Sequence, residues 1–170
     1  STMAHRDALT GTINRGHFEH SLAAAFDLAN LQQRPLSLAF IDLDDFKKIN
    51  DRHGHLVGDD VLKGVAQHLK ACVRTVDTVA RFGGEEFVII FPDTPLAGAQ
   101  ATIERVLKHL AQQPVAHVEG TPLHVTFSAG IACHHALAPF STPHTLLDAA
   151  DRALYRCKDQ GRNRVGIHQP

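Results

Sequence analysis

The feature that most constrains the fold of this chain is a pair of adjacent glycines between two strand-forming segments. Residues 83–86, Gly-Gly-Glu-Glu, separate Val79–Phe82 from the apolar run Phe87–Phe91. Two glycines permit a tight reversal and let a ligand approach the backbone, and the glutamates place negative charge beside that tip. The segment therefore predicts a β-hairpin. Taken alone the segment is more typical of an ordinary turn with solvated glutamates, so a functional role depends on what lies beside it.

A second acidic cluster follows the apolar run Leu36–Ile41, which predicts a buried central strand. Asp42, Asp44 and Asp45 emerge at its end, and Lys47 follows at the start of a helix. Divalent cations such as magnesium prefer carboxylates together with substrate phosphates, and a helix N-terminus suits the phosphates. If the hairpin lies beside this strand, one of its two glutamates completes the site, because successive strand residues point to opposite faces. On their own, Asp44 and Asp45 would be interpreted as a solvated turn that caps the helix.

The rest of the chain alternates helical and strand periodicity without an internal repeat or linker. This order predicts an α+β protein with a ferredoxin-like core, an antiparallel or mixed sheet, and helices mainly on one face. Residues 7–170 are expected to form a single domain, and residues 1–6 a lead-in that starts with a cloning remnant. The expected elements are a helix over Phe18–Ala29, the strand Leu36–Ile41, a short helix over Asp45–Asp51, a loop over Gly54–Gly58, a helix from Asp59 to Val73, hairpin arms Val79–Phe82 and Phe87–Phe91, a helix over Leu96–Leu110, a strand over Leu123–Cys133, a helix over His144–Cys157 and a strand over Arg164–Ile167.

Composition excludes several classes of function. The formal net charge is −1, from 17 basic and 18 acidic side chains, so no broad basic surface for a nucleic-acid polymer is expected. No apolar run is long enough to cross a bilayer, and no membrane contact is expected. The three cysteines are widely spaced, which argues against a disulfide framework or a zinc site and predicts reduced thiols in the cytoplasm.

Several motifs in order along the chain resemble the GGDEF family of diguanylate cyclases, in its GGEEF variant. The resemblance covers nearly the whole chain and implies a nucleotidyl-cyclase palm core, with a mostly antiparallel central sheet surrounded by helices. Thr12 and Ile13 depart from the usual lead-in pattern. The matching segments are Asp7–Gly11 with Asn14 and Arg15, Asp42–Lys47 with Asn50 and Asp51, Gly54 and His55 with Gly58 and Asp59, the Gly83–Phe87 hairpin tip, Ser128–Gly130, Ala150–Tyr155, Lys158 and Gly161–Asn163.

The resemblance implies the condensation of two GTP molecules into cyclic di-GMP with release of two pyrophosphates. It assigns two Mg²⁺ ions per active half-site to Asp42 and Glu85, with help from the Leu43 carbonyl, and Mn²⁺ is expected to substitute. Glu85 is also the candidate for accepting the proton of the attacking hydroxyl.

The same resemblance assigns guanine recognition to Asn50 and Asp59. A carboxylate can accept both the N1–H and N2–H donors of guanine, which adenine lacks, so GTP is expected to be preferred over ATP. As alternatives, Asp59 could be the N-cap of its helix, and the basic residues from Lys158 to Arg162 could be a solvated helix end. The further substrate contacts implied are Phe46, Lys47, Gly83, Gly84, Lys158 and Arg162.

Arg74 and Asp77 form an Arg-x-x-Asp sequence, which usually means only a surface ion pair. Its spacing before the hairpin matches the inhibitory product site of the family, to which Arg105 would add a secondary arginine. Catalysis is expected in a homodimer, with an upstream sensor or dimerisation module outside this chain. The alternatives are a catalytically weak domain that binds GTP or cyclic di-GMP, a cyclase that makes a cyclic mononucleotide, and a structural or protein-binding domain.

Overall fold

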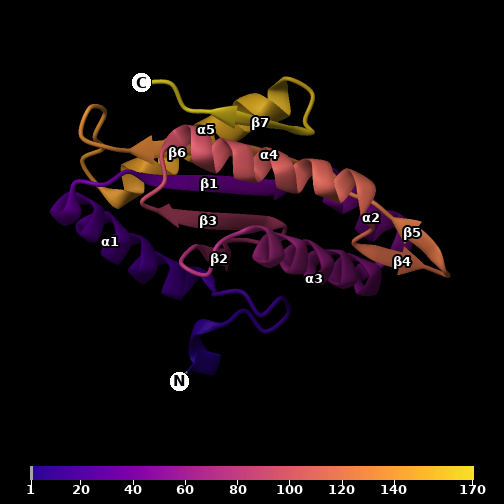
Figure 1. Ribbon diagram of the computed structural model, residues 1–170. Helices are drawn as coiled ribbons and strands as arrows, with labels where there is room; N and C mark the ends of the chain where they lie inside the picture. The colour runs from indigo at the N-terminus through magenta and orange to yellow at the C-terminus, as the bar shows by residue number, and fades with distance from the viewer. Residues whose placement is uncertain (1) are drawn as a thin grey trace.

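The computed structural model describes residues 2–170 (Figure 1). Ser1, where the expected cloning remnant begins, lies outside the described residues. The elements in order are η1 (Thr2–His5), α1 (Arg15–Gln32), β1 (Leu36–Leu43), α2 (Phe46–His53), α3 (His55–Cys72), β2 (Thr78–Arg81), β3 (Glu86–Pro92), α4 (Leu96–Gln112), β4 (Ala116–Val118), β5 (Thr121–Leu123), β6 (Phe127–His134), α5 (Pro143–Asp159) and β7 (Arg164–Ile167).

The central sheet has five strands in the order β2-β3-β1-β6-β7. β1 is antiparallel to both of its neighbours, β3 and β6, and only β7 runs parallel to its partner β6. This topology confirms the predicted α+β class with a mostly antiparallel sheet. It also places the end of β1 next to the Gly-Gly hairpin.

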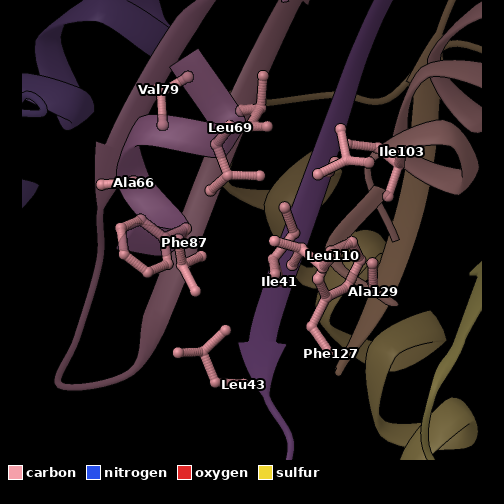
Figure 2. Close-up of a cluster of buried hydrophobic side chains, with 14 of the residues drawn as sticks. Ile41, Leu43, Ala66, Leu69, Val79, Phe87, Ile103, Leu110, Phe127 and Ala129 are labelled. Atoms are coloured by element: carbon pink, nitrogen blue, oxygen red, sulfur yellow. The ribbon is translucent and has the colours of Figure 1, made fainter. Parts of the chain in front are cut away.

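Helices cover both faces of the sheet, which confirms the surrounding helices implied by the resemblance and corrects the expectation from periodicity that the helices lie mainly on one face. Alternate residues of β1 point to opposite faces: Ala39 and Ile41 belong to a core with α3 and α4, whereas Leu38 and Phe40 belong to a core with α1 and α5. Figure 2 shows part of the first core, where Phe87 of β3 and Phe127 of β6 flank the central strand. Ligand access is therefore left to the ends of the strands.

Two boundaries differ from the sequence-based expectation. The expected loop Gly54–Gly58 is mostly helical, because α3 begins at His55 directly after Gly54, whose φ of 91° suits glycine and makes a sharp elbow with α2. The expected strand Leu123–Cys133 is interrupted: Leu123 is the last residue of β5, residues 124–126 are irregular, and β6 begins at Phe127. The short hairpin β4–β5, which turns at Gly120 before this segment, was not expected.

The lead-in to α1 adds to the edge of the sheet. Ile13 forms a parallel bridge with Ala80 of β2, donating its amide to the Val79 carbonyl at 3.2 Å and accepting from the Arg81 amide at 3.0 Å. Asn14 then caps α1 by accepting from the His17 amide at 2.9 Å. The start of the chain is thereby held against the hairpin.

The cysteines Cys72, Cys133 and Cys157 are all free, as predicted. Within residues 2–170, no helix combines the length and apolarity needed to span a membrane.

Candidate active site

Asp42 lies at the end of β1 and is only 7% exposed. Its direct neighbours across the sheet are Glu86 of β3 and Ser128 of β6, and residues directly opposite each other in antiparallel strands point to the same face. Lys158, near the end of α5, donates to the Asp42 carboxylate. The fold thus joins three segments distant in sequence at one carboxylate.

The two hairpin glutamates lie differently. The Glu85 carbonyl accepts from the Leu43 amide at 3.2 Å, which brings the backbone of the hairpin against the residue after Asp42. The half-buried Glu86 is the glutamate directly opposite Asp42. Burial raises the pKa of Glu86, the negative charges of Asp42 and Glu85 raise that pKa further, and Lys158 opposes them. Strand alternation had left either glutamate open as the partner of Asp42, whereas the family resemblance assigned only Glu85.

Arg81 braces the hairpin tip. Its Nε donates to the carbonyls of Gly83 and Gly84 at 3.2 Å each, and its Nη2 donates to Gly84 at 2.8 Å. Its Nη1 reaches both carboxylate oxygens of Asp7 at 3.3 Å. A Cβ at Gly83 would lie 2.2 Å from Glu86 Oε1, so a larger residue there would displace this glutamate. Arg81 and Asp7 therefore connect the lead-in to the tip, a link that sequence reasoning missed.

Asn50 of α2 and Asp59 of α3 flank the elbow between their helices. Asn50 Oδ1 is buried and has no hydrogen-bond partner. A Cβ at Gly58 would lie 1.8 Å from that oxygen and 3.3 Å from Phe46 Cζ, so Gly58 makes room for both side chains. Asp59 is half-buried within the helix, and the alternative that it caps α3 is wrong because Gly54 holds the N-cap position. An unpaired buried acceptor is costly unless a ligand donates to it.

Asp44 and Asp45, the two acidic residues just before α2, differ in burial and in hydrogen bonding. Asp44 is buried, 7% exposed, and accepts from Thr126 Oγ1, Ser128 Oγ and the Asn163 amide at 2.6, 2.7 and 2.9 Å, so the solvated-turn interpretation is wrong for it. Asp45 is exposed at the N-cap position with a φ of 56°, and its side chain makes no capping bond.

The predicted phosphate contacts are only partly assembled. Lys47 is exposed and bonded to Asp51 at 2.8 Å, one turn further along α2. Lys158 is beside Asp42, whereas Arg162 is exposed in the loop after α5 and has a φ of 64°. In the described chain, no group of three or more His, Cys, Asp and Glu side chains is arranged to hold a metal. The carboxylates of Asp42 and Glu85 nevertheless fit magnesium, which usually takes one or two protein carboxylates and completes its shell with water and substrate phosphates.

The predicted regulatory residues lie at the opposite end of the β2–β3 hairpin. Arg74 forks onto Asp77, with Nη2–Oδ1 at 2.8 Å and Nε–Oδ2 at 3.2 Å. The same Nη2 also reaches the Pro92 carbonyl at 2.8 Å and Thr94 Oγ1 at 2.7 Å. These bonds raise the pKa of Arg74, chiefly through Asp77. Arg105 joins Arg74 and Asp77 in lining a cavity of about 410 Å³.

A mostly antiparallel sheet with carboxylates at the end of its central strand, beside a Gly-Gly hairpin, defines a nucleotidyl-cyclase palm. The chain matches the family described as "Diguanylate cyclase, GGDEF domain" over residues 4–164. It therefore belongs to the GGDEF domain family of diguanylate cyclases.

Two curated relatives illustrate this membership. The chain is 42% identical over 164 residues to the response regulator PleD of Caulobacter vibrioides, covering 96% of this chain and 36% of that protein. It is 40% identical over 161 residues to the diguanylate cyclase DgcP of Pseudomonas aeruginosa, covering 95% of this chain and 23% of that protein. The chain thus spans about a third of the first relative and less of the second.

Solved structures agree with this membership. The GGDEF domain of DgcB from Caulobacter crescentus, in complex with c-di-GMP, has a TM-score of 0.91 and 32% identity, covering 98% of this chain and 97% of that one. The active GGEEF domain of a diguanylate cyclase from Vibrio cholerae has a TM-score of 0.85 and 32% identity, covering 92% and 97%.

Proposed function

We propose that this chain condenses two GTP molecules into cyclic di-GMP. Each 3′-hydroxyl oxygen forms a bond to the α-phosphorus of the other nucleotide, the bond to pyrophosphate breaks, and the hydroxyl proton passes to a base. The observation that carries this proposal is the convergence of Asp42, Glu85, Glu86 and Lys158 at the end of β1, in a member of the diguanylate cyclase family.

Asp42 and Glu85, with the Leu43 carbonyl, would hold two divalent ions, magnesium or manganese. When bound, these ions lower the pKa of the attacking hydroxyl and stabilise charge on the phosphoryl and leaving oxygens. Glu85 is placed to accept the hydroxyl proton. Lys158 neutralises Asp42 in the free protein, and its transfer to a substrate phosphate would release that carboxylate for the cation.

Guanine selection rests on Asn50 and Asp59. The unpaired Oδ1 of Asn50 requires a donor, and the Asp59 carboxylate can accept from the N1–H and N2–H groups of guanine. Adenine would leave these acceptors unpaired, which accounts for a preference for GTP over ATP. Phosphate contacts are assigned to Lys47, Lys158, Arg162 and the backbone amide of Phe46, with the close approach of backbone at Gly83 and Gly84.

One copy of the chain would hold one GTP, so two copies facing each other form the competent homodimer. Residues 7–170 act as one catalytic unit after a lead-in over residues 1–6, and a sensor or dimerisation module outside this chain would bring two copies together. The reaction takes place in the cytoplasm. Cyclic di-GMP inhibits by binding Arg74, Asp77 and Arg105, which line one cavity.

The proposal is tested by product analysis after incubation with GTP and magnesium. The concentrated chain and a fusion to a dimerising coiled coil are compared with Glu85→Gln and with Glu19→Gln, a matched change at an exposed glutamate of α1. Cyclic di-GMP from the parent and Glu19→Gln, but a loss on the order of 10²–10³-fold in Glu85→Gln, is the expected result.

Other outcomes identify the alternatives. Cyclic GMP without dinucleotide would indicate a mononucleotide cyclase. GTP binding without turnover in the dimerised fusion would indicate a binding domain, and no GTP binding at all would favour a structural role.

A further inference from the structure

Asp44 is a buried carboxylate for which the proposed reaction has no use. Its three hydrogen bonds come from Thr126, one residue before β6, from Ser128 of β6, and from the backbone of Asn163 just before β7. The Asp44 amide also donates to the Thr126 carbonyl at 3.0 Å. One side chain therefore joins the end of β1, which carries Asp42, to two neighbouring segments.

The segment held by Asp44 has an unusual backbone. Gly161, Arg162 and Asn163 have consecutive positive φ angles of 115°, 64° and 48°. A non-glycine residue keeps such a conformation only where its surroundings impose it. The Arg162 amide donates to the Cys157 carbonyl at 2.9 Å, which ties the loop to its own helix, whereas the bond from Asn163 to Asp44 ties it to β1.

We propose that Asp44 is a positioning residue for the triphosphate, which acts by holding the Gly161–Asn163 loop beside the end of β1. This inference rests on the proposed function, in which Lys158 and Arg162 bind substrate phosphates. Lys158 already contacts Asp42, so the phosphate-binding end of α5 and the metal-binding end of β1 meet at the point where Asp44 fastens them. Removal of the carboxylate would leave an amide and two hydroxyls without their acceptor and would release the loop.

Ligand truncation separates positioning from general structural damage. Calorimetry measures the binding of guanosine and of a GTP analogue that resists attack at the α-phosphate, each with magnesium, to the parent, Asp44→Ala, Asp44→Asn and the exposed control Asp27→Ala. Asp44→Ala is expected to lower the affinity for the analogue about tenfold, as for loss of a hydrogen bond to a charged group, and to leave the affinity for guanosine unchanged. Asp44→Asn restores most of the loss, because its amide oxygen still accepts from Asn163. An equal loss for both ligands, or no loss, would overturn the inference.

Backbone exchange gives a readout that needs no nucleotide. The Asn163 amide is expected to exchange faster with deuterium in Asp44→Ala than in the parent, and unchanged protection would overturn the inference. Arg162→Ala separates this inference from the proposed function. If Arg162→Ala weakens analogue binding and Asp44→Ala does not, the inference fails and the proposed function stands. If Arg162→Ala and Lys158→Ala both leave analogue binding unchanged, the proposed phosphate site fails and the inference fails with it.

Discussion

The two ends of the β2–β3 hairpin differ in how far their charges are compensated. At the Gly-Gly end, Lys158 donates to Asp42, and the negative charges of Asp42 and Glu85 add to the effect of burial in raising the pKa of Glu86. Asn50 Oδ1, in the predicted guanine site, is buried without a partner.

At the other end, charge and hydrogen bonding are already matched. Arg74 is paired with Asp77, whose side chain is 2% exposed, and the Nη2 that bonds to Asp77 also donates to the Pro92 carbonyl and to Thr94 Oγ1. His134 lies at the same end of the sheet, because both His134 and Pro92 pair with Leu36. Both ring nitrogens of His134 are hydrogen-bonded.

Under the proposed function, this difference predicts two kinds of recognition. At the Gly-Gly end, neighbouring like charges and an unpaired acceptor are unfavourable in the free protein. A bound cation and a base with hydrogen-bond donors would relieve both, so this end is stabilised more by its ligand than the other end. A guanidinium fork that is already aligned loses little conformational freedom on binding, so the second end is preorganised.

The largest expected effect comes from Arg74→Ala, which tests the preorganised end. Loss of the fork is expected to weaken cyclic di-GMP binding about 100-fold, measured by calorimetry, because several charge-assisted bonds are lost. The free energy of unfolding falls by about 1–3 kcal/mol, since the buried Asp77 loses its guanidinium partner and keeps only the bond from the backbone amide of residue 74. Arg34→Ala is the control, because its ion pair with Asp93 is exposed and is worth no more than about 1 kcal/mol. Unchanged product affinity in Arg74→Ala would contradict the comparison.

Arg81→Ala tests whether the Gly-Gly end depends on a braced tip. We expect kcat/KM for cyclic di-GMP formation to fall about tenfold, because the Gly83 and Gly84 carbonyls lose their donor and the tip that carries Glu85 loosens. Steady-state kinetics on the dimerised fusion measures this loss. Asp7→Asn keeps the bonds from Arg81 to the tip and should have a smaller effect. If the two variants lose equal activity, the lead-in contact, and not the brace, controls the tip.

His134 provides a pH test of the compensated end. Its Nδ1 accepts from the Phe140 amide at 2.9 Å, so Nε2 donates to Asn30 Oδ1 at 2.6 Å, and burial together with His135 lowers the pKa of His134. The unfolded chain therefore binds this proton more readily than the folded protein. The resulting stabilisation is complete above the unfolded pKa of about 6.5 and is lost as the pH falls through that value.

Urea unfolding at about pH 7.5 and about pH 5.5 measures this contribution. His134→Gln should reduce the acid-induced loss of stability relative to the parent, because the variant has no imidazole to protonate in the unfolded chain. An identical pH dependence in parent and variant would show that His134 is not held neutral by its contacts.

The smallest effect is expected from Glu86→Gln, and it has the opposite sign for stability. Without metal at neutral pH, removal of one repelling charge should raise the free energy of unfolding by about 0.5 kcal/mol, as for a partly solvated charge pair. The raised pKa predicts that the parent gains stability from protonation of Glu86 on acidification, and the variant lacks this gain. If urea unfolding shows that the metal-free variant is less stable than the parent, the negative charge of Glu86 is already balanced by its surroundings, and the comparison between the two ends is wrong.

Much of the fold was predictable from local pattern. The Gly-Gly hairpin, the buried β1 and the helices α1, α4 and α5 were expected near their observed positions, because apolar periodicity and turn residues act over a few neighbours. The predicted start of α3 at Asp59 was wrong. Asp59 resembles an N-cap, but the sharp turn at Gly54 lets the helix begin earlier, at His55. The prediction from periodicity that helices lie mainly on one face of the sheet was also wrong, because periodicity does not show which face each helix covers.

Some residues of the candidate site were likewise predictable from the sequence, and others were not. The motifs around Asp42, Asn50, Asp59 and the hairpin were recognisable in the sequence, because the chemistry of a nucleotide and a metal demands particular residue types at particular spacings. The roles of Glu86 and Asp44 were not, because each depends on a partner far along the chain: Glu86 on its register opposite Asp42, and Asp44 on its three donors in β6 and just before β6 and β7.

The sequence by itself therefore determined the family, the order of elements and the residue types available for chemistry. Only the tertiary structure decided which of those charges meet without compensation and which are already paired. The physical reason is that an electrostatic or hydrogen-bonding state depends on distance and burial. Strand register and helix packing set both, and they bring Lys158 to Asp42 across 116 residues of sequence and Arg81 to Asp7 across 74.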